Sequence, residues 1–123
     1  MKITLLGDNT IRLEQTGEHM TIEADSADRV YSPFQMLASG LAFCADSVMR
    51  SWASNAKLSA DDLAIEVRWT FADDPHRVGK MEMKVMWPSL PENRVAAAER
   101  VAGLCAIHAT LTHPPEISTT IER

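Results

Sequence analysis

The chain has 123 residues, a length that predicts one domain over residues 1–123 with room for a compact core. Its hydrophobic share of 46% and charged share of 24% are ordinary for a soluble globular protein. The formal net charge of −5 argues against nucleic acid or an anionic membrane surface as a partner, because both need a basic face. No apolar run approaches the roughly 20 residues that a membrane-spanning helix needs.

The N-terminal segment is predicted to form short strands. Lys2–Leu6, Thr10–Gln15 and His19–Ala24 favour β structure and are separated by turn residues, so a three-stranded meander is expected. The first apolar run is too short for a signal peptide. Two cysteines without an export signal indicate a reducing compartment, the cytoplasm. There a cysteine pair is more often catalytic, redox-active or metal-binding than a permanent disulfide.

Ser32–Trp52 predicts a long buried helix around which the rest of the chain is organised. Ser32 suits the N-cap, Pro33 the first helical position and Gln35 the capping box. An apolar stripe follows at spacings of three and four, formed by Phe34, Leu37, Leu41, Cys44, Val48 and Trp52. Because Cys44 lies on this stripe, its sulfur is expected to face packed protein or a pocket.

The second half predicts a β-hairpin, two shorter helices and a last strand. Leu63–Phe71 and Met81–Trp87 alternate apolar and polar residues and form the hairpin. One helix starts near Pro91, and Cys105–Leu111 resumes the helical pattern. A final strand is expected from the alternation of Ile117, Thr119 and Ile121. The order βββ-α-ββ-α-β is an α+β fold with helices on one side of a mostly antiparallel sheet.

Cys44 and Cys105 are the main candidates for chemistry. They are either two buried small hydrophobes or a thiol pair able to close to a disulfide, and their spacing leaves both interpretations open. A position at a helix start would favour the thiolate of Cys105, whereas Cys44, deep in its helix, would need a nearby cation.

Two neighbouring residues receive less reactive interpretations. Cys105-x-x-His108 has a metal-binding spacing, but no second ligand pair accompanies it, so no metal is expected. Asp46 is expected to be a solvated or capping carboxylate.

Two stretches of the chain resemble the OsmC/Ohr family of thiol peroxidases. Ser32–Cys44 is similar to the family's Asn/Ser-Pro-Glu-x-Leu opening, its run of small residues and its cysteine eleven positions after the proline. Cys105–Leu111 resembles the second-cysteine segment, and the order of elements matches along nearly the whole chain. The resemblance implies antiparallel sheets wrapped around two central helices. It also implies an obligate, intertwined homodimer with two active sites at the interface.

The resemblance further implies a role for each site residue. Cys44 would attack the peroxide oxygen and become a sulfenic acid, and Cys105 would condense with it to a disulfide that an outside dithiol reduces. Neither a metal nor an organic cofactor is implied. An apolar pocket that includes Phe34, Leu37 and Leu41 would select organic hydroperoxides.

The sequence departs from the family pattern at the residues that activate the first cysteine. Phe34 stands where the family has its catalytic glutamate. The family's arginine is missing from the turn Gly7-Asp8-Asn9, which leaves Arg12 and Arg29 as candidates for that role. Two alternatives therefore stay open: a non-catalytic protein of the same fold that binds a small apolar ligand at the dimer interface, and a structural relic with two inert cysteines.

Overall fold

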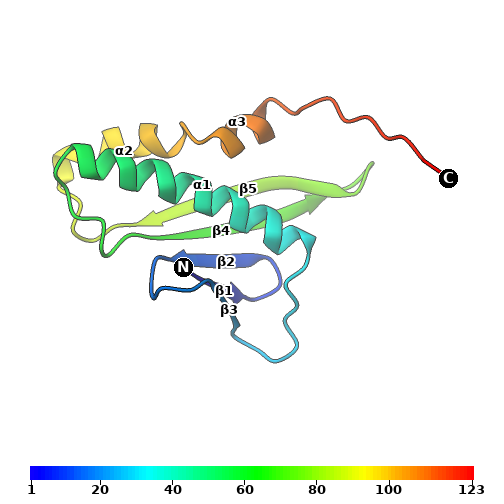
Figure 1. Cartoon of the computed structure of the whole chain (residues 1–123), viewed down its shortest axis with the longest axis horizontal. Helices are drawn as coiled ribbons and strands as arrows, with labels where there is room; N and C mark the ends of the chain where they lie inside the picture. Colours follow the sequence, from blue (N-terminus) through cyan, green and yellow to red (C-terminus); the bar gives the residue numbers. More distant parts are fainter.

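The computed structural model describes residues 1–123 and combines a five-stranded sheet with three α-helices (Figure 1). The strands are β1 (Lys2–Leu6), β2 (Thr10–Glu14), β3 (Thr21–Ala24), β4 (Ala64–Ala72) and β5 (Arg77–Met86). The helices are α1 (Pro33–Asn55), α2 (Val95–Ala102) and α3 (Ala106–Thr112), with the 3-10 turn η1 (Glu92–Arg94) ahead of α2. The helices lie on one side of the sheet, so the predicted α+β class is confirmed (Figure 1).

The strand order is β3-β1-β2-β4-β5. All neighbouring strands are antiparallel except β1 and β3, which run parallel, so the predicted meander is wrong for the third strand. The reason is that β4 occupies the other edge of β2, where Ile65 pairs with Leu13 and Val67 with Ile11. Both edges of β2 are then taken, by β1 and β4, and β3 pairs with the outer edge of β1 instead.

One face of the sheet forms the core with α1. Alternate residues of the strands point inward and are buried, and the facing side of α1 contributes small residues that allow a close approach. The buried strand residues are Ile3, Leu5, Ile11, Leu13, Ile65, Val67 and Trp69. The buried apolar residues of α1 are Ala38, Leu41, Ala42, Ala45, Met49 and Ala53. In turn, α2 and α3 pack on α1.

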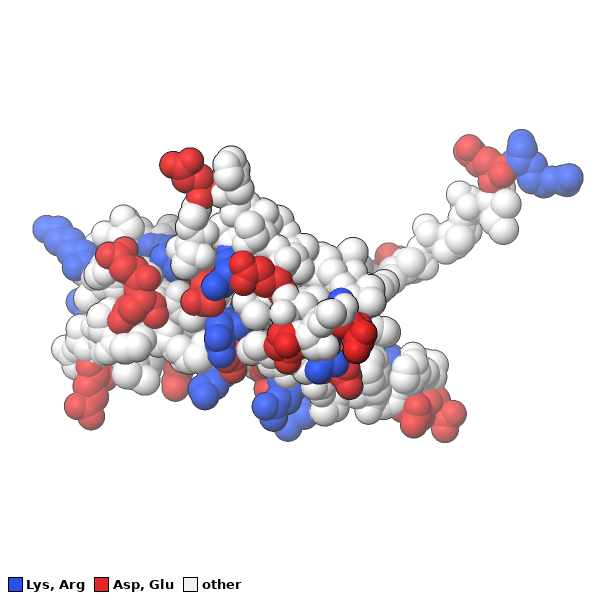
Figure 2. Space-filling view, turned by 90° about the horizontal axis from the view of Figure 1, so that it is seen from below, with Lys and Arg blue, Asp and Glu red and all other residues white.

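The opposite face of the sheet is charged. Figure 2 shows acidic and basic side chains interspersed over this side of the molecule. Cross-strand ion pairs contribute to the pattern, with Lys2 and Glu14 at 3.8 Å and Arg12 and Glu66 at 2.8 Å. An interspersed face of this kind is a solvated surface rather than a basic patch.

The long helix begins as expected and ends later. Ser32 is the N-cap, and its backbone N–H donates to Oε1 of Gln35 at 3.2 Å. The helix runs to Asn55, three residues beyond the predicted end at Trp52. None of the helices is both long enough and apolar enough to span a bilayer.

The predicted last strand does not form. The residues after His113 have no regular structure, and Ile117 and Ile121 are 85% and 88% exposed. Figure 1 shows this C-terminal segment extending away from the body of the molecule. A strand needs an edge to pair with, and the segment leads away from both edges of its own sheet.

Candidate active site

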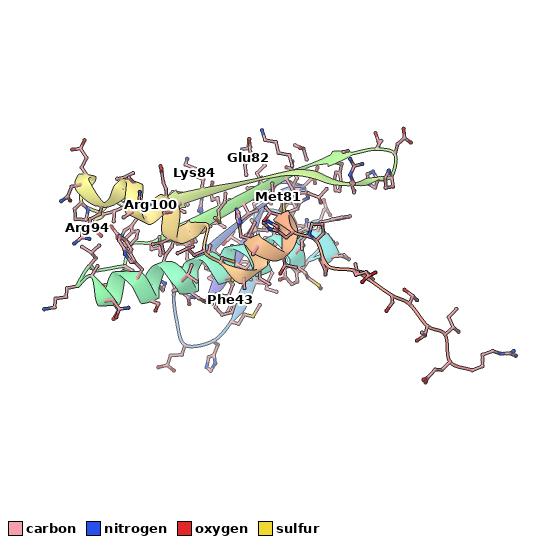
Figure 3. All side chains as sticks on the ribbon, turned by 90° about the horizontal axis from the view of Figure 1, so that it is seen from above. Phe43, Met81, Glu82, Lys84, Arg94 and Arg100 are labelled. Atoms are coloured by element: carbon pink, nitrogen blue, oxygen red, sulfur yellow. The ribbon has the colours of Figure 1, made fainter.

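The fold brings Cys44 and Cys105 together although they belong to different helices. Cys44 lies midway along α1, and Cys105 is the N-cap of α3, which packs on α1 (Figure 3). Both thiols are free, Cys44 partly exposed and Cys105 fully buried. The two thiols lie close enough that each shifts the pKa of the other.

The surroundings of Cys44 favour its thiolate. Burial raises its pKa, but hydrogen bonds from the Cys105 thiol and from the backbone N–H groups of Ile107 and Ala106 outweigh burial, so the pKa lies below its ordinary value. No lysine or arginine contributes to this shift. The donors that lower the pKa come from Cys105 and the first turn of α3, in place of the nearby cation that the sequence led us to expect.

Cys105 has the opposite tendency. Its Sγ accepts a hydrogen bond from the backbone N–H of His108 at 3.4 Å, as expected for an N-cap. Burial and the hydrogen bond to Cys44 nevertheless raise its pKa above the ordinary value. Backbone N–H groups at the start of α3 thus lower the pKa of both sulfurs, but only at Cys44 do the hydrogen bonds outweigh burial. The two opposite pKa shifts favour the thiolate form at Cys44 and the thiol form at Cys105.

A pair of Cys105 variants tests the hydrogen bond between the thiols. Cys105→Ala is expected to slow alkylation of Cys44 by iodoacetamide at neutral pH by roughly tenfold, because a hydrogen bond to a charged group is worth about 1.5 kcal/mol or more. Cys105→Ser keeps a donor and should alkylate at close to the wild-type rate. The wild-type rate should reach half its maximum at a lower pH than that of the urea-unfolded chain. Equal rates of Cys44 alkylation in the Cys105→Ala and Cys105→Ser variants would contradict the role of Cys105 as a hydrogen-bond donor to Cys44.

A cavity of about 660 Å³ lies between α1, β5 and α3. Neither cysteine lines it, but Leu41, one turn before Cys44, and His108, three residues after Cys105, do. Phe34, Leu37 and Leu41 of α1 form one wall, so all three predicted pocket residues line the same cavity. The remaining apolar wall residues are Val78, Met81, Met83 and Leu111. The two methionines also pack against the core. A second cavity of about 480 Å³ shares Met83 and His108 with the first and continues along β5 to Trp87.

Asp46 is a buried carboxylate, not the solvated or capping group that the sequence predicted. It is 1% exposed and accepts hydrogen bonds from Gln15 at 2.9 Å and from Arg50 at 3.0 Å. Arg50 also donates to the carbonyl oxygens of Ala60 at 2.8 Å and Leu63 at 3.3 Å. Through these hydrogen bonds, Asp46 connects α1 to the residue after β2, and Arg50 connects α1 to the loop before β4. The Asp-x-x-x-Arg spacing on one helix is the signal that would have revealed it.

The structure has no cluster of three or more His, Cys, Asp or Glu residues suited to a metal ion. His108 lies in the first turn of α3, for which Cys105 is the N-cap, and it lines both cavities.

The model of the OsmC-like protein family matches residues 25–120, a segment that contains both cysteines. The chain belongs to the OsmC-like family. A crystal structure from Psychrobacter arcticus, described as an osmotic stress induced and detoxification response protein, is similar with a TM-score of 0.62 and 21% identity over 88% of this chain and 84% of the other. An OsmC-like hydroperoxide resistance protein from Jannaschia sp. has a TM-score of 0.61 and 22% identity over 80% and 71%. No curated protein matches the sequence.

The OsmC-like chain does not bring either candidate arginine to the thiols. Arg12 lies on the charged face of the sheet, where its Nη2 is 2.8 Å from Glu66. Arg29 precedes α1 and pairs with Asp8 and, at 3.0 Å, with Asp25. Both guanidinium groups are therefore engaged with carboxylates away from Cys44.

At the position where the family resemblance places a glutamate, this OsmC-like chain buries part of an aromatic ring. Phe34 is 37% exposed and lies in the first turn of α1. Its ring is edge-on to Phe71, with centroids 4.9 Å apart. The position contributes to the apolar wall and carries no charge.

Proposed function

We propose that this OsmC-like protein is a cytoplasmic thiol peroxidase that reduces organic hydroperoxides, with Cys44 as the attacking and Cys105 as the resolving cysteine. The observation that supports it most is the contact of two free thiols whose pKa values are shifted in opposite directions. Two free thiols, one of them in a buried position, also suit a reducing compartment such as the cytoplasm. Neither a metal nor an organic cofactor takes part in the proposed reaction.

In the proposed reaction, the Cys44 thiolate attacks the terminal oxygen of the hydroperoxide. A sulfur–oxygen bond forms, the oxygen–oxygen bond breaks, and the alkoxide leaves and is protonated to the alcohol. The resulting sulfenic acid reacts with the thiol of Cys105, which forms the disulfide and releases water. An external dithiol then reduces the disulfide in two exchange steps. Cys44 is the partly exposed sulfur and is the one that an incoming dithiol can reach.

The hydrogen bonds at Cys44 support this chemistry without an arginine or a glutamate. Donors that already surround the sulfur stabilise the thiolate before a peroxide arrives, and such preorganised donors need no rearrangement during the reaction. The Cys105 thiol is one of these donors and is also the group that reacts next. Its proximity limits the time during which the sulfenic acid can be over-oxidised.

We also propose that the protein functions as an intertwined homodimer, and the outer face of α1 supports this. Met36 and Phe43 are 52% and 46% exposed, and Phe43 lies on the side of α1 away from β5 (Figure 3). Between and beyond them this face carries the uncharged residues Gly40, Ser47 and Ser51. An exposed helix face without charge is typical of a surface that another chain covers.

The C-terminal segment supports the intertwined arrangement. Its alternating residues Ile117, Thr119 and Ile121 find no partner strand in their own chain. The outer edges of β3 and β5 are both free in the sheet. A second copy would offer such an edge to the segment, and pairing there would bury its isoleucines.

Phe43→Glu is expected to convert the dimer into a monomer, because it places a charge at the centre of the proposed interface. Light scattering coupled to size-exclusion chromatography would measure the mass. Thr70→Glu, on the charged face of β4, is the matched control and should leave the mass unchanged. A monomeric wild type, or a Phe43→Glu protein that remains dimeric, would contradict this interface.

A Cys105→Ser variant tests the proposed peroxidase directly. After one equivalent of cumene hydroperoxide, this variant should hold a sulfenic acid on Cys44 that dimedone traps, whereas the wild type should hold a disulfide and no adduct. Mass spectrometry of the Cys44 peptide distinguishes the two products. A Cys44 thiol that stays unmodified in both proteins would rule out the proposed role.

Phe34 favours a second candidate function, a non-catalytic protein that binds a small apolar ligand. Phe34 places an apolar ring where the family resemblance has a glutamate. It lines a cavity of about 660 Å³, which is large enough for a drug-sized ligand. The candidate predicts an apolar molecule bound to the purified protein and a Cys44 thiol that alkylates slowly near neutral pH. Rapid alkylation of Cys44 would favour the peroxidase.

A further inference from the structure

The second cavity, of about 480 Å³, lies between α1, β5 and α2 and takes no part in the proposed thiol chemistry. Neither cysteine lines it. Its volume is within the range of sites that bind small molecules. Its apolar wall includes Met49 of α1, Met83 and Val85 of β5, Trp87 after β5, and Ala98 and Ala102 of α2.

Glu99 of α2 is the only acidic residue that lines this cavity. It lies on the same side of the helix as Val95, Ala98 and Ala102, which line the cavity with it. Charged residues of an amphipathic helix normally occupy the opposite side. The carboxylate of Glu99 nevertheless forms no ion pair. The other titratable residue of the wall is His108 of α3, in the part that both cavities share.

The charged residues of the neighbouring elements do not reach Glu99. Glu82 and Lys84 alternate with the residues of β5 that line the cavity, and Figure 3 shows both on the side of β5 away from the helices. Arg100 follows Glu99 directly and therefore projects roughly 100° further around the helix. Arg94 and Arg100 do not line the cavity. A cation is therefore the group that this wall lacks.

We propose that the second cavity binds a small organic cation, with its ammonium group beside Glu99 and its apolar body between α2 and β5. The indole N–H of Trp87 donates to the carbonyl oxygen of Ser59 at 3.0 Å, so this ring presents no unpaired donor to a ligand. Aromatic rings and the polarizable thioethers of Met49 and Met83 suit the neighbourhood of a cation. The net charge of −5 also favours the approach of a cation.

The test compares the binding of phenethylamine, phenethyl alcohol and phenylacetate by isothermal titration calorimetry. These probes share an apolar body and differ in charge. The Kd of the amine should be at least about fivefold lower than that of the alcohol, and phenylacetate should bind most weakly. Glu99→Gln should bring the Kd of the amine within about twofold of that of the alcohol. Glu92→Gln is the matched control, because Glu92 precedes α2 and does not line the cavity, and it should keep the wild-type preference.

Two tryptophan variants test which cavity holds the amine. Val95 is 43% exposed and lines only the second cavity, so Val95→Trp should narrow that cavity and raise the Kd of the amine at least about tenfold. Leu37 lines only the first cavity, and Leu37→Trp should leave the Kd unchanged.

Four results would overturn the inference. They are equal affinities of the wild type for amine and alcohol, a preference for the amine that survives in Glu99→Gln, an amine affinity that Leu37→Trp lowers and Val95→Trp does not, and the absence of binding by all three probes. The last result is the one expected if a second copy of the chain covers the cavity.

Discussion

Replacement of Cys44 by serine is expected to abolish the consumption of organic hydroperoxide. A serine hydroxyl stays protonated near neutral pH and is a poor nucleophile toward a peroxide oxygen, so no covalent intermediate forms. The donors from Cys105, Ile107 and Ala106 stabilise a thiolate and cannot make an alkoxide available. With cumene hydroperoxide and dithiothreitol, the rate should fall to that of the reagents alone.

The control for this experiment is Cys105→Ser, which retains the attacking thiol. It should consume the first equivalent of hydroperoxide at a rate close to that of wild type and differ only in the fate of the oxidised sulfur. Wild type and Cys44→Ser proteins that consume cumene hydroperoxide equally fast would end the enzymatic interpretation. The OsmC-like fold would then serve binding alone.

The second large effect is expected on stability, at the buried ion pair of α1. Arg50→Leu should lower the free energy of unfolding by about 3 kcal/mol or more, because it leaves the buried carboxylate of Asp46 without its charged partner. The variant also removes donors from the carbonyl oxygens of Ala60 and Leu63. Urea unfolding at a fixed protein concentration measures the loss.

Arg12→Leu is the matched control, since Arg12 forms a comparable ion pair with Glu66 on the exposed face of the sheet. Its cost should be about 1 kcal/mol or less. Adding Asp46→Leu to Arg50→Leu should recover part of the lost stability, because the double variant no longer buries an unpaired charge. Equal losses for Arg50→Leu and Arg12→Leu would show that Asp46 is not held as the structure describes.

Local signals in the sequence were sufficient for most of the fold. The Ser32 cap with Pro33 placed the start of α1, and the alternation in β4 and β5 placed the hairpin. These features depend on residues within a few positions of one another, so a single sequence carries them. The family resemblance covered the same elements and agrees with the family match over residues 25–120.

The features that the sequence did not reveal depend on distant partners. The position of β3 depends on which edge β4 occupies, and Asp46 is buried because Gln15 and Arg50 meet it. The donors at Cys44 come from the first turn of α3, and no spacing within α1 indicates them. The alternating residues Ile117–Ile121 have strand character, but their own chain provides no edge beside them.

The most direct test of the account is the product that forms when the reduced wild-type protein receives one equivalent of cumene hydroperoxide. Non-reducing digestion and mass spectrometry should find the peptide of Cys44 joined to the peptide of Cys105 by a disulfide, with the chain lighter by the mass of two hydrogen atoms. A mixture in which both cysteines remain free thiols, or in which Cys44 is oxidised to the sulfinic acid while Cys105 stays free, would contradict the proposal that these two sulfurs act together.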